Sequence, residues 1–78
     1  MAGKFIAFAF KSKKERNDAL EAVAQKYRDL QTNISEQLLD KGFQYVLFIE
    51  DRSSFTFNLT LGALVKEYGG VPRDQVRI

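Results

Sequence analysis

The stretch from Ser54 to Leu61, SFTFNLTL, alternates bulky and polar residues at every step, and its conformation decides the fold. A strand would separate two sets of side chains by face: Phe55, Phe57, Leu59 and Leu61 on one, and Thr56, Asn58 and Thr60 on the other. A helix beginning at Ser54 would instead align a different stripe: Phe57, Leu61, Leu64, Val65 and Tyr68. We favour the strand, with its aromatic side facing the core, because most of its residues suit strands. The helix remains the alternative.

The segments around this stretch predict two further strands. From Lys4 to Phe10, one face carries Ile6, Phe8 and Phe10, and the other carries Phe5, Ala7 and Ala9. The segment from Phe43 to Asp51 is apolar on both faces, with Tyr45, Leu47 and Ile49 opposite Val46 and Phe48. Strands of this composition are typical of the centre of a sheet.

A long helix is expected between these two strands. Ser12 and Glu15 form a capping box at its start, and Gly42 supplies a stop. The apolar residues recur at steps of three and four: Leu20, Val23, Tyr27, Leu30, Ile34 and Leu38. An unbroken helix would measure ~43 Å, whereas a domain of this length is only ~30 Å across. We therefore favour a kink or restart at Thr32-Asn33, and an overhanging helix that needs a second chain is the alternative.

A second helix should end at Gly69-Gly70, and the tail RDQVRI should add an edge strand with Val76 and Ile78 inward. The resulting order is β-α-β-β-α-β in a single domain, residues 1–78. It predicts a two-layer α+β sandwich with a mainly antiparallel sheet and both helices on one face. The alternative is β-α-β-α-β with a parallel sheet.

Composition narrows the classes of function. The chain has neither Cys nor His and a formal charge of +2, which argues against thiolate metal sites, His-based catalysis and dedicated nucleic-acid binding. No apolar run approaches the ~20 residues that a membrane span needs, and the N-terminal segment is too short for a secretory signal. We expect a soluble, cytoplasmic, non-enzymatic protein with no catalytic residues, metal site or cofactor, and with no contact to a membrane.

The Phe-x-Phe spacing in FIAFAF and RSSFTF, within this element order, resembles RNA-recognition motifs. The resemblance implies that Phe55 and Phe57 stack bases on an open sheet. In that arrangement Thr56, Asn58 and Thr60 would point into the core, where each unpaired polar group costs ~1–3 kcal/mol. We therefore expect the aromatic side of this segment to be core.

The sheet face turned away from the helices is the first candidate site. It would collect small and mildly apolar side chains around one aromatic ring: Ala7, Ala9, Val46, Phe48, Thr56, Asn58 and Thr60. Such a surface suits docking of a partner or sheet-to-sheet packing in a two-fold dimer.

A basic cluster is the second candidate site, for phosphate or nucleic acid: Lys11, Lys13, Lys14 and Arg16, with Arg52 and then Arg73 and Arg77 as extensions. Glu50 and Asp51, at a strand end, are the weakest candidate, for metal binding or acid/base chemistry.

These patterns favour a protein-binding module that occupies a surface of a larger protein or complex, with a homodimer as one form. An inhibitor of a host complex, of phage or mobile-element type, is one such role, although no motif supports it. The alternative hypothesis is a nucleic-acid or phosphate binder that uses the basic cluster.

Overall fold

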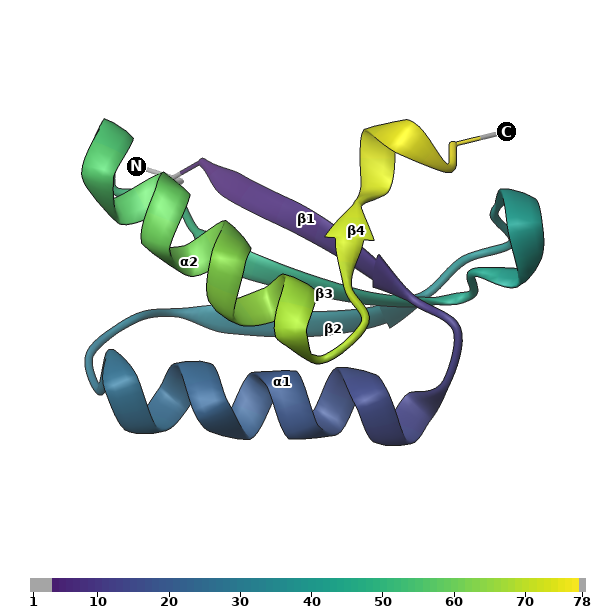
Figure 1. Cartoon of the computed structure of the whole chain (residues 1–78), viewed down its shortest axis with the longest axis horizontal. Coiled ribbons are helices and arrows are strands. Elements are labelled where there is room, and N and C mark those ends of the chain that lie inside the picture. The colour runs from purple at the N-terminus through teal and green to yellow at the C-terminus, as the bar shows by residue number, and fades with distance from the viewer. Residues whose placement is uncertain (1–3, 78) are drawn as a thin grey trace.

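The computed structural model describes residues 4–77, which contain two helices and four strands (Figure 1). The elements follow in this order: β1 (Phe5–Phe10), α1 (Lys13–Lys26), β2 (Thr32–Glu36), β3 (Tyr45–Glu50), α2 (Phe55–Glu67) and β4 (Val71–Pro72). Two 3-10 turns complete the described chain, η1 (Asp40–Gly42) before β3 and η2 (Arg73–Gln75) after β4.

The strands form one antiparallel sheet in the order β2-β3-β1-β4. Both helices cover the same face, where their apolar sides pack on β1 and β3 (Figure 1). The buried residues of this helix-side core are Phe8, Phe10, Ala19, Val23, Leu47, Ile49, Leu61 and Val65. The predicted two-layer α+β sandwich and its β-α-β-β-α-β order are confirmed.

The predicted faces of the two central strands are also confirmed. Phe8 and Leu47 are paired across β1 and β3 and lie in the helix-side core, whereas Ala9 and Val46 are paired on the opposite face. Strand side chains alternate strictly between faces, so one correct register places all of them.

The preferred strand for Ser54–Leu61 is wrong, and the helical alternative is correct. Ser54 is the N-cap of α2, and its hydroxyl accepts a 3.3 Å hydrogen bond from the Phe57 N–H. Leu61 and Val65, one helical turn apart, are fully buried against the sheet. Burial of the helical stripe outweighs the weak helix propensity of the two threonines and Asn58.

The long first helix is also wrong, in both its continuous and its kinked form. Helix α1 starts at the expected cap, where Ser12 accepts from the Glu15 N–H at 3.1 Å, but it ends at Lys26. The following segment forms β2, which pairs with β3. Thr32, Asn33 and Ile34 are weak helix formers, and an unpaired edge of β3 gives their backbone groups hydrogen-bond partners.

The predicted order of helices and strands is therefore correct, although Thr32–Glu36 is a strand instead of a helix and Ser54–Leu61 is helical instead of a strand. Thr32–Glu36 supplies one of the four strands of the sheet, and Ser54–Leu61, which was predicted as a strand, supplies none. With 14 residues, α1 is ~21 Å long and fits within the 30 Å longest dimension of the molecule.

The expected edge strand in the tail is replaced by β4 at Val71–Pro72 and by η2. Val76 is buried, although on the side of the sheet away from the helices and not in a strand, and Ile78 lies outside the described residues. The Val76 carbonyl accepts a 2.8 Å hydrogen bond from the Asp40 N–H, which ties the tail to η1. A second buried cluster forms beneath these two turns, on the side of the sheet away from the helices: Ala9, Leu39, Phe43, Val46 and Val76.

Candidate protein-binding surface

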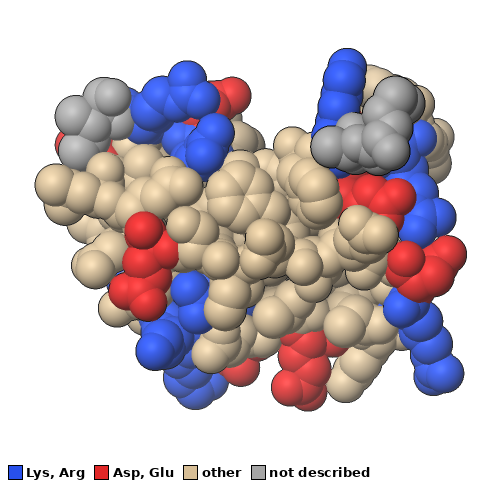
Figure 2. All heavy atoms as spheres, turned by 180° about the vertical axis from the view of Figure 1, so that it is seen from behind, with Lys and Arg blue, Asp and Glu red and all other residues tan. Residues whose placement is uncertain are grey.

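The turns η1 and η2 cover only part of the sheet face that lies away from the helices. The part left open, here called the open sheet face, contains Phe5 and Ala7 of β1, Asn33 of β2 and Phe48 of β3. Figure 2 shows this side of the molecule, with few charged side chains at its centre and Lys, Arg, Asp and Glu gathered toward the edges.

The structure divides the seven residues predicted for this face. Ala7, Ala9, Val46 and Phe48 do share it, but Ala9 and Val46 are fully buried beneath the turns. The other three residues, Thr56, Asn58 and Thr60, lie on α2 in the opposite layer. They were misplaced because period-two alternation was taken for a strand. Ala7 and Phe48 are thus the predicted residues that a partner on the open sheet face would touch.

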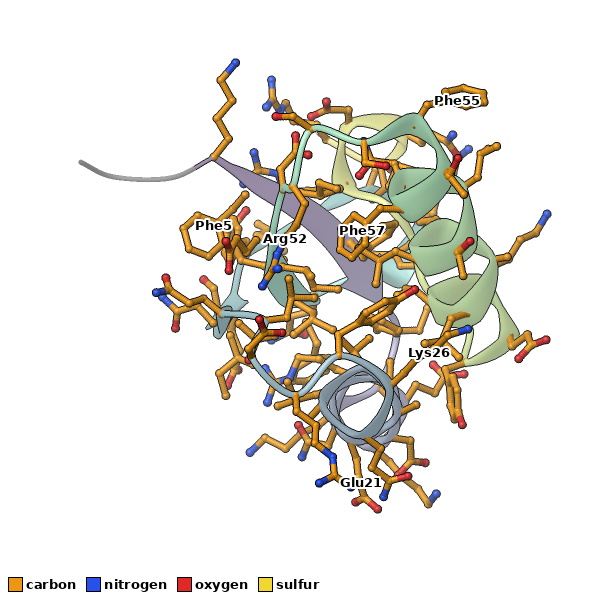
Figure 3. All side chains as sticks on the ribbon, turned by 90° about the vertical axis from the view of Figure 1, so that its left-hand side faces the viewer. Phe5, Glu21, Lys26, Arg52, Phe55 and Phe57 are labelled. Atoms are coloured by element: carbon orange, nitrogen blue, oxygen red, sulfur yellow. The ribbon has the colours of Figure 1, made fainter. Side chains whose placement is uncertain are left out.

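Several residues of this surface were absent from the predicted protein-binding set, and two of them, Phe5 and Arg73, are central to it. Phe5 is 43% exposed and points away from α2 (Figure 3). Its alternation with Ala7 and Ala9 placed it on this face, so the sequence held the signal. Arg73 was expected only as an extension of a basic patch, yet its guanidinium carbon lies 5.6 Å from the centre of the Phe48 ring. No local pattern indicates that contact, because it depends on the path of the tail.

The open sheet face contains two hollows. The larger, with a volume of about 360 Å³, has apolar walls that include Phe5, Ala7 and Phe48 and a rim formed by Arg73, Asp74 and Arg77. The smaller measures about 180 Å³ and lies between Phe5, Asn33 and Phe48. Phe5 and Phe48 line both hollows, which makes this pair of rings the centre of the surface.

Of the predicted basic cluster, Lys11, Lys13 and Lys14 are exposed near the start of α1, whereas Arg16 is engaged within the fold. Arg16 is only 3% exposed, and its guanidinium donates to the Ser35 carbonyl and to the Asn17 side chain. It therefore joins α1 to β2. Lys14 is bound to Asp18 at 2.7 Å, and Lys11 lies 5.4 Å from the centre of the Phe43 ring.

Arg52 lies at the other end of the sheet from this cluster. Lys11 follows Phe10 at one end of β1, whereas Arg52 follows Glu50, which pairs with Phe5 at the opposite end. The two strand ends are roughly 17 Å apart. Arg52 contacts Asp29 at 3.4 Å and Glu50 at 3.7 Å, so its charge is balanced locally.

The strand-end carboxylates have structural contacts. Glu50 accepts a 3.1 Å hydrogen bond from the Gln31 N–H, and Asp51 accepts one of 2.7 Å from the Ser53 N–H. Ser53 has a positive φ of 56°, and the Asp51 bond supports this turn into α2. Within residues 4–77, no three acidic side chains gather as a possible metal site.

Helix α2 carries a second apolar area on its outer side. Phe55 is 79% exposed and points away from the sheet, whereas Phe57 points inward and meets Tyr27 edge-on, with 5.1 Å between ring centres (Figure 3). Leu59, one turn after Phe55, lies beside a shallow groove of about 430 Å³ between α1 and α2. Phe55 is therefore a rival contact point, on the other side of the molecule from Phe5.

Comparison with protein families, with characterised proteins and with solved structures finds no match to this chain. Neither helix in the described part of the chain is long and apolar enough to cross a membrane.

Proposed function

We propose that this chain is a non-enzymatic protein-binding module whose contact surface is the open sheet face. The observation that carries the proposal is the exposed ring of Phe5 beside Phe48, in hollows with apolar walls. Covering the exposed part of Phe5 would contribute roughly 2 kcal/mol at about 25 cal/mol per Å². Aromatic side chains at the centre of a surface with a polar rim are typical of protein interfaces.

The turns η1 and η2 support this role, because together they cover one end of the face and leave a recess beside them that Phe5 and Phe48 line. A partner that fills the recess meets β1 and β3, the two central strands of the sheet. Central strands backed by a packed core are rigid, so little order is lost when a partner binds. Inhibition of a larger host complex, by occupying one of its surfaces, is a narrower form of the same proposal.

The test compares two phenylalanines on opposite sides of the molecule. Affinity-tagged wild-type protein, Phe5→Asp and Phe55→Asp are used to capture partners from the native host. We expect Phe5→Asp to lose at least ~90% of the captured protein, because it places a charge in an apolar contact. Phe55→Asp is the matched control and should capture as the wild type does. Capture that survives Phe5→Asp and is lost in Phe55→Asp would assign the interface to α2 instead.

Two further measurements distinguish the forms of binding. An apolar interface should retain its partner in a high-salt wash, whereas a phosphate-driven complex formed by Lys11, Lys13 and Lys14 would dissociate. If the partner is a second copy of this chain, light scattering should report a dimer for the wild type and a monomer for Phe5→Asp. Phe48→Asp should act in the same direction, although Phe48 is more buried than Phe5 and its replacement also tests folding.

A further inference from the structure

Arg73 occupies an unusual position among the arginines of this chain. Its side chain is partly buried, its guanidinium lies over the Phe48 ring, and its Nε is buried with no hydrogen-bond partner within residues 4–77. None of the ion pairs in that range involves Arg73. A buried donor without an acceptor is unfavourable, and a guanidinium with neither an acceptor at Nε nor an ion pair within residues 4–77 favours a ligand that brings an acceptor to the group.

The other arginines near the sheet differ in this respect. Arg16 donates to Ser35 and Asn17, and Arg52 contacts Asp29 and Glu50. Arg77, on the same rim as Arg73, is paired with Asp74 at 3.1 Å. Asp74 is thus already engaged, and among residues 4–77 the charge of Arg73 is the one in the larger hollow without an ion-pair partner.

The walls of that hollow indicate which group a ligand would carry beside the acceptor for Arg73. They include the apolar side chains of Phe5, Ala7, Phe48 and Pro72. A volume of about 360 Å³ suits one or two side chains. A phosphate group is usually held by several donors, often including backbone N–H groups, whereas this rim offers a single uncompensated guanidinium.

We propose that the open sheet face binds a protein segment that presents a carboxylate to Arg73 beside a large apolar side chain seated against Phe5 and Phe48. This inference rests on the proposed function and specifies the chemistry of the partner. The planar guanidinium can bind a carboxylate with two parallel hydrogen bonds, and its cation–π contact with Phe48 helps to hold it in place. The complementary charge selects the partner, and the apolar side chain fills the recess.

The test uses two small probes of equal shape. N-acetylphenylalanine carries a carboxylate next to an aromatic ring, and N-acetylphenylalaninamide is its uncharged counterpart. Each is titrated into ¹⁵N-labelled protein and followed by the NMR signals of Ala7, Phe48 and Arg73. We expect the acid to shift these signals and to bind at least ~10-fold more tightly than the amide.

Three variants assign the effect to the guanidinium. Arg73→Gln should reduce binding of the acid to that of the amide, and Arg73→Lys, which keeps the charge but lacks the planar fork, should also weaken it. Arg28→Gln is the control, because it removes the same charge from an exposed position outside the hollow. It should leave the affinity for the acid unchanged. The comparison of acid and amide on the wild type decides the matter even if an Arg73 variant fails to fold.

Several results would overturn the inference. Equal binding of acid and amide would leave an apolar surface without a role for Arg73, and the proposed function would stand. Tighter binding of inorganic phosphate or of an oligothymidylate at these signals would assign the hollow to phosphate or nucleic acid. Loss of acid binding in Arg28→Gln would show that the affinity for the acid depends on the net charge of the protein and not on Arg73. The proposed function fails separately, if capture of the partner survives Phe5→Asp.

Discussion

Gly70 is a residue whose missing side chain is required by the core. A Cβ atom at this position would lie 2.7 Å from Cζ of Phe10 and would also collide with Cγ1 of Val65. Both neighbours are fully buried and have no room to move. Gly62, within α2, has nothing within 4 Å of the same position.

Gly70→Ala should therefore lower the free energy of unfolding by about 1–3 kcal/mol through overpacking. Gly62→Ala is the matched control, and it should raise stability by about 0.5–1 kcal/mol, because alanine suits a helix better than glycine. Urea unfolding of both variants measures the difference. Equal effects of the two substitutions would contradict the packing around Phe10.

Lys14 is the residue for which the structure predicts a change in titration. The hydrogen bond and the charge of Asp18 raise the pKa of Lys14 above its ordinary value of 10.5. The stabilisation is present below pH 10.5 and is lost as the pH rises through the higher pKa of the folded state. Because the pair is exposed, its contribution is small.

Asp18→Asn should return the pKa of Lys14 toward its ordinary value. NMR titration of the side-chain ammonium measures this directly. The difference in stability between the wild type and the variant should shrink at alkaline pH, where Lys14 loses its charge. An unchanged midpoint in Asp18→Asn would show that the ion pair does not form in solution.

At the scale of the element, helix α2 decides which side chains reach the surface. Its cap at Ser54 sets the phase of the helix, so Phe57 and Leu61 face the sheet while Phe55 and Leu59 face solvent. The same residues arranged as a strand would have formed a different surface.

Ser54→Ala removes the oxygen that accepts the Phe57 N–H, and it should cost about 0.5–2 kcal/mol of stability. Thr56→Ala, at an exposed position two residues on, is the control and should raise stability by a few tenths of a kcal/mol. Circular dichroism during thermal unfolding measures both variants. Equal stability of Ser54→Ala and the wild type would show that this cap does not stabilise α2.

At the scale of the whole molecule, a single sheet has buried clusters on both faces, within dimensions of 30 × 24 × 20 Å. The second cluster depends on the tail, because Val76 packs in the same cluster as Val46. The Val76 carbonyl also accepts a hydrogen bond from the Asp40 N–H. The tail thereby limits the open sheet face and carries Arg73 to it.

Val76→Ala should lower the free energy of unfolding by about 2 kcal/mol, because it removes two buried methyl groups and leaves a cavity. It should also speed hydrogen exchange at the Asp40 amide, whose acceptor is the Val76 carbonyl. Arg77→Ala, next along the chain, breaks only a surface pair and should change stability by less than about 0.5 kcal/mol. Equal exchange rates at Asp40 in Val76→Ala and the wild type would contradict the closure of this face by the tail.

The sequence by itself determined the features that depend on local periodicity and capping. The faces of β1 and β3 follow from strict alternation, and the start of α1 follows from Ser12 and Glu15. Ala7 and Phe48 were placed on the correct face for the same reason. These features depend on residues that are close together in the sequence, so they can be predicted without knowing the contacts between distant residues.

Where the local preferences for helix and strand are nearly equal, the conformation of a segment depends on tertiary structure alone. Thr32–Glu36 became a strand because β3 had a free edge, and Ser54–Leu61 became a helix because the sheet buries Leu61 and Val65. The same is true of the candidate site, since Arg73 meets Phe48 from 25 residues further along the chain. Such choices depend on contacts between distant residues, which hydrophobic burial stabilises far more than propensity does.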